Sequence, residues 1–192
     1  MVNIGLVERN RSEVCQVLNT LLADEFLLST KTKNYHWNVT GLHFHDLHQL
    51  FGEQYAKLDL LIDQIAERVR VLDNNALGTM MEFLRFTRLE EHPYYELSDR
   101  GMVEELCDDH ETLIRALRKI LERNADIYCD AGTTDLLTTV MQHDENMAWM
   151  LGSVLGQKSH LKQWVKNQEQ TQRENGVEIS VANVSSGDKG NS

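Results

Sequence analysis

The sequence predicts an all-α protein, a bundle of four long helices with one long crossover connection between the second and the third. Three observations support this fold class. Apolar residues recur at spacings of three and four along four long segments, which is typical of amphipathic helices. Strong helix formers such as Leu, Glu, Gln and Ala are plentiful, whereas the 192 residues include only one proline. Short turns join these segments except at one long link, as in bundles with a single crossover.

The predicted elements follow in order along the chain. The first helix is expected over residues 12–38. The segment NVTGLHF ends it, and Gly41 is the glycine expected just after the helix C-terminus. The second helix is expected over residues 44–72. In the long link that follows, GTMMEFLRF favours a short helix and HPYY a turn. The third helix is expected over residues 101–128 and the fourth over residues 134–155, with DAGTTD as the turn between them.

Composition limits the kind of protein. Helical periodicity fades beyond residue 156, so residues 1–156 are expected to form one domain and residues 157–192 a polar, at least partly mobile tail. No apolar run approaches the roughly 20 residues of a membrane span, and we expect neither a span nor a signal peptide. The cysteines lack metal-ligand spacing and indicate free thiols in a reducing cytoplasm; they are Cys15, Cys107 and Cys129. The net charge of -11 favours cations over nucleic acid as partners.

The second predicted helix has two apolar faces. On a helical wheel, one face is an ordinary core stripe that includes Leu58, Ile65 and Val69. The opposite face combines two apolar residues with two carboxylates, namely Ala56, Leu60, Asp63 and Glu67. A helix that is apolar on two faces is usually buried on both, so the second face is predicted to be a subunit interface.

This second face also has the residue types for half of a metal site. Asp63 and Glu67 are four residues apart and present their oxygens to one patch, and His48 lies on the same general side. Fifteen residues of helix, a rise of about 22 Å, separate His48 from Asp63, so one chain cannot hold a metal ion with both. Two antiparallel copies would place His48 of one opposite the carboxylates of the other, forming two identical sites suited to iron, zinc or manganese. The alternative is a salt bridge from Asp63 or Glu67 to an arginine such as Arg68 or Arg70.

The segment YHWNVTGLHFHDLHQLF, followed by YAKLDLLIDQIAERVR, resembles the Dps family, the DNA-binding proteins from starved cells. The HWxVxG, LH and DxxAER elements have the order and spacing of that family, and the resemblance extends from about residue 10 to residue 156. It implies a ferritin-like four-helix bundle with a short helix in the crossover, assembled as a hollow dodecamer. It also implies a cytoplasmic ferroxidase that oxidises Fe(II) with peroxide or dioxygen between two-fold-related subunits, stores the ferric mineral and protects against oxidative stress.

The resemblance assigns the metal ligands residue by residue. The family's ferroxidase ligands correspond to His36 in the HW element, His48 in the LH element, and Asp63 and Glu67 in DQIAER. Trp37 corresponds to a tryptophan that lies close to this centre in the family. Three of the four ligands are those that the helical wheel placed at a two-fold interface.

The sequence departs from the family pattern at Gly52, four residues after the LH histidine, where the family usually has Asp or Glu. Either the site lacks one ligand and binds its second metal weakly, or another side chain replaces the carboxylate. His45, one turn before His48, is a candidate, and Glu53 is adjacent to Gly52. An imidazole in place of a carboxylate would favour zinc or alter the oxidant preference. A further reading is that Gly52 makes room for a close helix contact.

The turn before the last helix offers a second functional region. In the family this region lines an acidic three-fold pore for iron entry, which makes Asp130 and Asp135 pore candidates. Thr139 stands where a third pore acid often occurs. Loop, polar-face or interior roles are favoured over ligation for the remaining histidines of the bundle, which are His43, His110 and His143.

DNA binding is not expected, despite the family name. The acidic and basic residues of segment 1–13 cancel, and the tail from residue 156 holds five basic residues against four acidic ones. Such tails offer few phosphate contacts. The alternative function is a nucleoid-compacting structural protein with an impaired ferroxidase site. Iron oxidation and gel retardation separate these two hypotheses.

Overall fold

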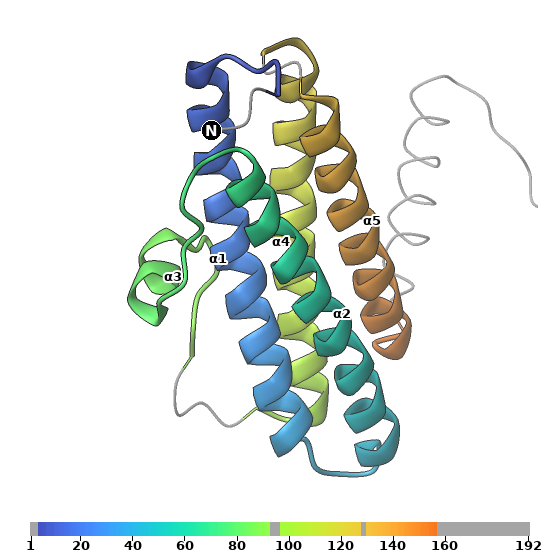
Figure 1. Cartoon of the computed structure of the whole chain (residues 1–192). Coiled ribbons are helices and arrows are strands. Elements are labelled where there is room, and N and C mark those ends of the chain that lie inside the picture. Colours follow the sequence, from blue (N-terminus) through green and yellow to red (C-terminus); the bar gives the residue numbers. More distant parts are fainter. Residues whose placement is uncertain (1–3, 93–96, 128–129, 157–192) are drawn as a thin grey trace, which may run out of the picture. The chain divides into compact units, whose positions relative to one another are not determined.

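The computed structural model describes residues 4–92, 97–127 and 130–156, and these residues form five α-helices (Figure 1). The long helices are α1 (Glu8–Asn38), α2 (Phe44–Val71), α4 (Asp99–Ile127) and α5 (Ala131–Val154). The short helix α3 (Met80–Phe86) lies in the connection between α2 and α4. The predicted all-α bundle with a helix in its crossover is confirmed, although α1, α4 and α5 begin up to about one turn earlier than expected. Most of the HPYY turn, Cys129 and the polar tail lie outside the described residues.

A tight turn joins α1 to α2 and makes them antiparallel neighbours. Val39 ends α1 by donating its backbone N–H to the carbonyl of Tyr35. Gly41 follows with a φ of 107°, a left-handed conformation that glycine adopts readily because it has no Cβ. The turn therefore brings the last turn of α1 against the first turns of α2.

The bundle core consists of two hydrophobic clusters that follow each other along the helices. The cluster nearer the α1–α2 turn includes Leu28, Phe51 and Leu113, whereas the cluster at the opposite end includes Leu18 and Leu137. Burial of each such side chain stabilises the fold by about 1.5–3 kcal/mol relative to exposure. All four long helices contribute to both clusters, so burying them fixes the arrangement of the bundle.

The crossover connection is held against α1. Phe83 of α3 is buried and stacks on Phe26, with ring centroids 4.1 Å apart. After α3, Arg88 donates its backbone N–H to Asp24 at 2.6 Å and its Nε to the same carboxylate at 2.8 Å. Burial raises the pKa of Asp24 even though the Arg88 charge and hydrogen bonds act to lower it. These contacts position α3 on the flank of α1.

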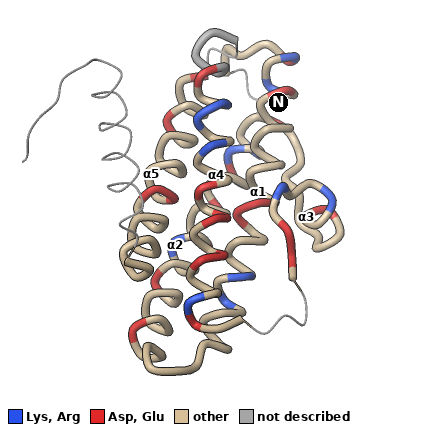
Figure 2. The backbone as a smooth tube through the Cα atoms, turned by 180° about the vertical axis from the view of Figure 1, so that it is seen from behind, with Lys and Arg blue, Asp and Glu red and all other residues tan. Residues whose placement is uncertain are grey.

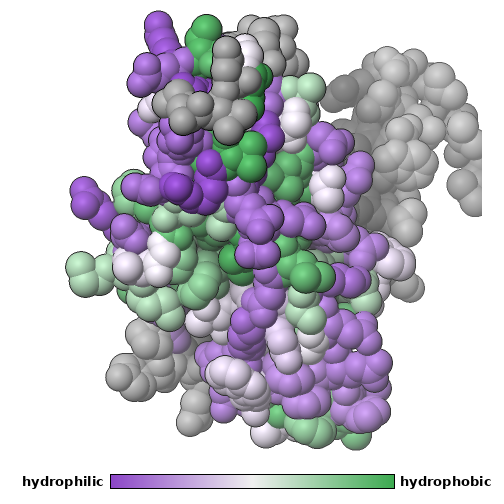
Figure 3. All heavy atoms as spheres, in the orientation of Figure 1, coloured by the Kyte–Doolittle hydropathy of each residue, from purple (hydrophilic) through white to green (hydrophobic). Residues whose placement is uncertain are grey.

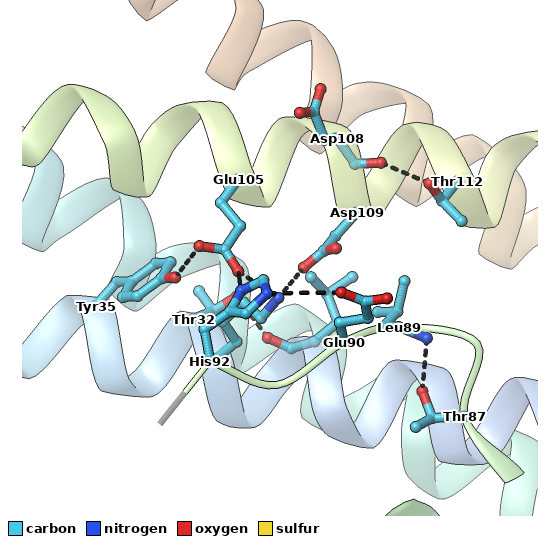
Figure 4. A network of polar contacts seen from close by, with 12 residues as sticks. Thr32, Tyr35, Thr87, Leu89, Glu90, His92, Glu105, Asp108, Asp109 and Thr112 are labelled. Atoms are coloured by element: carbon cyan, nitrogen blue, oxygen red, sulfur yellow. Dashed lines mark hydrogen bonds and ion pairs between the residues drawn. The ribbon is translucent and has the colours of Figure 1, made fainter. Parts of the chain in front are cut away.

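An ion-pair network joins α1 to α4 (Figure 4). Lys31, whose side chain is 6% exposed, donates to Glu105 at 2.8 Å and to Asp109 at 2.7 Å. The Tyr35 hydroxyl donates to the other oxygen of Glu105 at 2.6 Å, and Nδ1 of His92 lies 2.7 Å from Glu105. Burial, together with the contact to Glu105, raises the pKa of Tyr35. The network fastens α4 and the preceding connection to α1.

The surface of the described helices is mixed in charge. Figure 2 shows acidic and basic positions interspersed along the helices when the bundle is seen from behind. Among the helices in the described residues, none is both long and apolar enough to cross a membrane. Cys15 and Cys107 are buried free thiols.

Candidate metal centre

Two of the predicted ligands, His36 near the end of α1 and His48 near the start of α2, lie against each other. Their rings stack with centroids 3.8 Å apart and an interplanar angle of 18°. Nδ1 of His36 lies 2.6 Å from the carbonyl oxygen of His48, and Nδ1 of His48 lies 2.8 Å from the carbonyl oxygen of His36. Each ring is therefore held by the backbone of the other residue.

These reciprocal bonds determine which ring nitrogen is available for a metal. A carbonyl oxygen can only accept, so each Nδ1 carries the proton that it donates. In the neutral imidazole, Nε2 then has a free lone pair, which is the form that binds metals. A backbone carbonyl behind the second ring nitrogen is a common support of ligating histidines, because it sets both tautomer and orientation. One protomer thus presents two preorganised nitrogen donors.

Aromatic side chains surround the histidine pair. Phe44 stacks on His48 with centroids 5.2 Å apart, and Tyr55 meets His36 edge-on at 5.3 Å. Trp37, which follows His36 in sequence, is 71% exposed. The rings are thus packed from the protein side, whereas the neighbouring tryptophan lies on the surface of the protomer.

Gly52 lies directly beside the His36 ring. A Cβ at this position would be 3.2 Å from Cε1 and 3.3 Å from Nδ1 of His36, which is tighter than an ordinary van der Waals contact. The His36 ring has little freedom to move away, since its Nδ1 is bonded to the His48 carbonyl. This geometry supports the reading that Gly52 makes room for a close helix contact. The loss of a metal ligand at this position stays a prediction.

Asp63 and Glu67 are both exposed on α2. The arginines that could have paired with them have other partners in the part of the chain that the structure describes. Arg68 donates to Asp130 at 2.6 Å, and Arg70 donates to the Asn74 carbonyl at 2.6 Å. The salt-bridge alternative is therefore not realised among the described residues, and the role of the two carboxylates as ligands stays a prediction. The described residues of one protomer contain no group of three or more His, Cys, Asp or Glu arranged to hold a metal ion.

The face of α2 that carries these carboxylates is apolar and uncovered in the protomer. Leu60 is 67% exposed, and Ala56 is exposed one turn before it. Helix α3, on the flank of α1, also exposes large apolar side chains, and apolar atoms gather over it and beside it (Figure 3); these side chains are Met80, Met81, Leu84 and Phe86. A patch of this kind marks an interaction site on most soluble proteins.

The remaining histidines near the centre are exposed. His45 lies in the first turn of α2 and His43 is the residue before that helix. His43 makes no side-chain hydrogen bond to the helix N-terminus. The role of His45 as a replacement ligand stays a prediction.

The pore candidates differ sharply in their surroundings. Asp130 is 8% exposed, caps the N-terminus of α5 through Thr133 and forms an ion pair with Arg68 at 2.6 Å. Burial acts to raise the pKa of Asp130, but hydrogen bonds from Thr133 and Arg68 outweigh it and hold the pKa below its usual value. Asp135 is exposed and Thr139 half-buried. Within the protomer Asp130 has a structural role, and a pore role for either acid stays a prediction.

We expect Asp130→Ala to destabilise the bundle by about 2 kcal/mol, because it removes a helix cap and leaves Arg68 unpaired. The folded-state pKa of Asp130 is depressed, so its contribution is present above the ordinary pKa of 3.8 and is lost as the pH falls through the folded value. The difference between wild type and variant should therefore shrink in acid. Urea denaturation at fixed protein concentration measures both effects. The matched control Asp135→Ala, at an exposed position, should change stability by less than about 0.5 kcal/mol, and equal effects of the two variants would contradict the structural role.

Sequence reasoning missed one polar cluster inside the bundle. His110, expected on a polar face or in the interior, is fully buried, and its Nδ1 lies 2.9 Å from Oδ1 of Asp144. Glu25 and Asp144 are also fully buried, and neither was singled out. The available signal was their spacing, since both continue the apolar stripe of their helices. Asp144, for example, lies between the buried residues Val140 and Met147.

Comparisons with known proteins agree with this architecture. The family model for the ferritin-like domain matches residues 15–160. An uncharacterised low temperature-induced protein of Nostoc sp. is 48% identical over 154 residues, which cover 80% of this chain and 86% of that protein. The DNA protection during starvation protein 2 of Bacillus anthracis is 38% identical over 147 residues, covering 76% of this chain and 98% of that protein. The Dps crystal structure from Vibrio cholerae, described as a ferritin-like diiron-carboxylate protein, aligns with a TM-score of 0.75 at 31% identity, covering 81% of this chain and 96% of that one.

The five-helix bundle and the matching family model define a ferritin-like protein. Within that superfamily, two of the proteins just described carry the Dps or DNA-protection name, and each is more than 30% identical to this chain over at least three quarters of its length. The chain belongs to the Dps family of mini-ferritins, as its sequence motifs predicted.

Proposed function

We propose that this protein is a ferroxidase that oxidises Fe(II) with peroxide or dioxygen and stores the ferric mineral in a hollow dodecamer, thereby protecting the cell from oxidative stress. The reaction sites would lie between two-fold-related copies. The observation that carries this proposal is the reciprocal hydrogen bonding of His36 and His48, which leaves Nε2 of both rings free to bind a metal.

The exposed face of α2 would supply the carboxylate half of each site. Antiparallel pairing of two copies of α2 would bury Leu60 and place Asp63 and Glu67 of one copy opposite the histidine pair of the other. If His48 faces the midpoint of the two carboxylates, the two-fold axis crosses the helix near Ala56. Two imidazoles and two carboxylates would then surround each site, a donor set that suits iron. Zinc fits the same donors and would compete with iron without undergoing redox chemistry.

The residues would perform distinct parts of the reaction. Two Fe(II) ions supply the two electrons that convert one peroxide and two protons into two water molecules. Asp63 and Glu67 provide hard oxygen donors, which favour the Fe(III) product over Fe(II) and so help the oxidation. His36 and His48 hold the incoming Fe(II) without adding negative charge. The net charge of -11 per chain would concentrate cations around the shell.

We expect His48→Ala combined with Asp63→Ala to reduce iron oxidation at least ~100-fold, since both halves of each site lose a ligand. The rate is followed by the absorbance of ferric products after Fe(II) and peroxide, or Fe(II) and dioxygen, are mixed with the protein. The matched control, His143→Ala with Glu122→Ala, removes the same types of group from exposed positions on α5 and α4 and should behave as wild type. Wild-type protein that oxidises iron no faster than buffer would refute the proposal.

The alternative function is a DNA-binding, nucleoid-compacting structural protein with an impaired site. Its support is the name of one relative, the DNA protection during starvation protein 2 of Bacillus anthracis. The negative net charge and the interspersed surface charges argue against it. Gel retardation at low salt tests it directly, and a shifted band without iron oxidation would make it the preferred function.

The departure at Gly52 leads to a separate prediction about His45. If His45 replaces the missing carboxylate, His45→Ala should weaken zinc binding as severely as His48→Ala does. Calorimetric titration of the two variants with Zn(II) measures affinity and stoichiometry. Unchanged binding by His45→Ala would remove His45 from the ligand set and leave the close contact between Gly52 and the His36 ring as the reason for the glycine.

A further inference from the structure

Three polar residues occupy positions in the bundle core where apolar side chains are expected. Glu25 of α1, His110 of α4 and Asp144 of α5 each have 0% exposure. They come from three different helices, and the two hydrophobic clusters of the core lie on either side of Asp144 along α5. Polar groups are retained in such places only when they are hydrogen-bonded, because burying an unpaired one is costly.

The contacts among these residues are incomplete if both carboxyl groups are ionised. Nδ1 of His110 lies 2.9 Å from Oδ1 of Asp144. Among the described residues, Oδ2 of Asp144 and both carboxyl oxygens of Glu25 then lack a hydrogen-bond donor. Glu25 nevertheless lies within hydrogen-bonding reach of Asp144. A proton on Glu25 would therefore give Oδ2 of Asp144 its missing donor, and would leave one oxygen of Glu25 and Nε2 of His110 without a partner among the described residues.

The charges around Glu25 favour that proton. Burial is the largest effect and raises the pKa of Glu25 well above its ordinary value of 4.5. The negative charges of Asp144, across the core on α5, and of Asp24, on the same helix, act in the same direction. The Arg88 guanidinium, from the connection after α3, opposes them but binds Asp24 directly. Two desolvated carboxylates in contact cannot both remain ionised at low cost.

We propose that Glu25, Asp144 and His110 form a proton-binding site in the bundle core, which makes the protomer sensitive to pH. Glu25 is a neutral carboxylic acid and donates its proton to Oδ2 of Asp144. Nδ1 of His110 donates to Oδ1 of the same carboxylate. The site is separate from the proposed metal centre and does not depend on iron chemistry.

The sign of the pH dependence follows from the raised pKa. Between the ordinary pKa of 4.5 and the folded value, the folded chain binds one proton more than the unfolded chain. The contribution of Glu25 to stability is fully present below pH 4.5 and is lost progressively as the pH rises toward the folded value. Within that window, the equilibrium constant for unfolding increases about tenfold per pH unit through this one group.

The test is Glu25→Gln, which keeps the shape and a hydrogen-bond donor toward Asp144 but removes the titration. We expect the variant to lose this tenfold-per-unit pH dependence and to be relatively more stable than wild type as the pH rises from 5 to 8. Urea denaturation at several pH values and a fixed protein concentration measures the difference. The control Glu8→Gln, at an exposed position of the same helix, should keep the wild-type dependence. Parallel pH profiles of wild type and Glu25→Gln would overturn the proposal.

Infrared difference spectroscopy gives a readout that does not depend on stability. Wild type at neutral pH should show the carbonyl stretch of a buried carboxylic acid, and Glu25→Gln should lack it. Asp144→Asn, which removes the neighbouring charge, should shift that band while keeping the acid. Absence of the band from wild type would refute the shared proton.

A divalent cation in place of the proton is the competing occupant. Titration with Zn(II) or Mn(II) in the His48→Ala, Asp63→Ala background distinguishes the two, because the proposed metal centre is disabled there. We expect Glu25→Gln to leave metal stoichiometry unchanged in this background. Loss of one bound ion per chain on Glu25→Gln would replace the proton site by a metal site.

Discussion

Leu60→Glu should abolish iron oxidation and dissociate the two-fold pair at the same time. Leu60 is 67% exposed in the protomer and lies about one turn from the position where the proposed axis crosses α2. Burying one leucine stabilises an interface by about 1.5–3 kcal/mol, and each pair buries two. A buried glutamate instead would carry an unpaired charge into the interface, one turn before Asp63 on the same face of the helix. The expected effect therefore exceeds the loss of the leucine contacts alone.

Light scattering and iron oxidation on the same sample test this expectation. We expect a smaller particle and oxidation no faster than that of iron in buffer, because each half-site then lacks the ligands of the other copy. Leu60→Met is the matched control, since it preserves apolar surface at the same position and should keep both assembly and activity. A Leu60→Glu protein that remains assembled, or that oxidises iron as a monomer, would refute the two-fold location of the site.

Lys31→Ala should destabilise the protein by about 3–5 kcal/mol, the cost of breaking a buried ion pair by removing one partner. The Lys31 ammonium lies 2.8 Å from Glu105 and 2.7 Å from Asp109. Without it, two carboxylates of α4 that are 17% and 14% exposed face each other with no lysine between them (Figure 4). The hydrogen bonds from Tyr35 and His92 stabilise the charge of Glu105, but they do not reach Asp109. The melting temperature of a chain of this size should fall by about 10 °C.

Thermal and urea denaturation at neutral pH and constant protein concentration measure the loss. Arg100→Ala is the control, because the Arg100–Glu104 pair is 64% and 48% exposed and should contribute less than about 1 kcal/mol. The combined replacement Lys31→Met, Glu105→Gln and Asp109→Asn removes all the charges together and should recover much of the stability that Lys31→Ala loses. A Lys31→Ala variant as stable as Arg100→Ala would show that the network is solvated and contributes little.

The helices and their order could be predicted from sequence because helical periodicity is a local property. Each long segment repeats its apolar residues with the period of the α-helix, and the structure differs mainly at helix ends, where capping contacts and fraying decide the boundary. The second apolar face of the second helix could also be predicted from sequence, and its residues Leu60 and Ala56 are exposed in the protomer. The separation of His48 from Asp63 along one helix followed from helix geometry alone.

Contacts between helices could not be obtained in this way. Arg68 had carboxylates near it in sequence, yet it pairs with Asp130, 62 residues away. Gly52 looked like a missing ligand, and only the structure shows that the His36 ring lies within 3.2 Å of the Cβ it lacks. Both outcomes depend on the rotation and register of one helix against another. The spacing of residues along a single helix does not determine either of these.

The sequence by itself determined the helix content, the crossover, the exposed apolar face and, through its motifs, the residues nominated as ligands. Only the tertiary structure decided that His36 and His48 bind each other's backbone, and hence that Nε2 of each ring is the free nitrogen. It also decided that Glu25, His110 and Asp144, spread over 120 positions of the chain, meet in one buried layer. The physical reason is range: helical periodicity acts between residues three or four apart, whereas hydrogen bonding and desolvation act between whichever groups the packed core brings into contact.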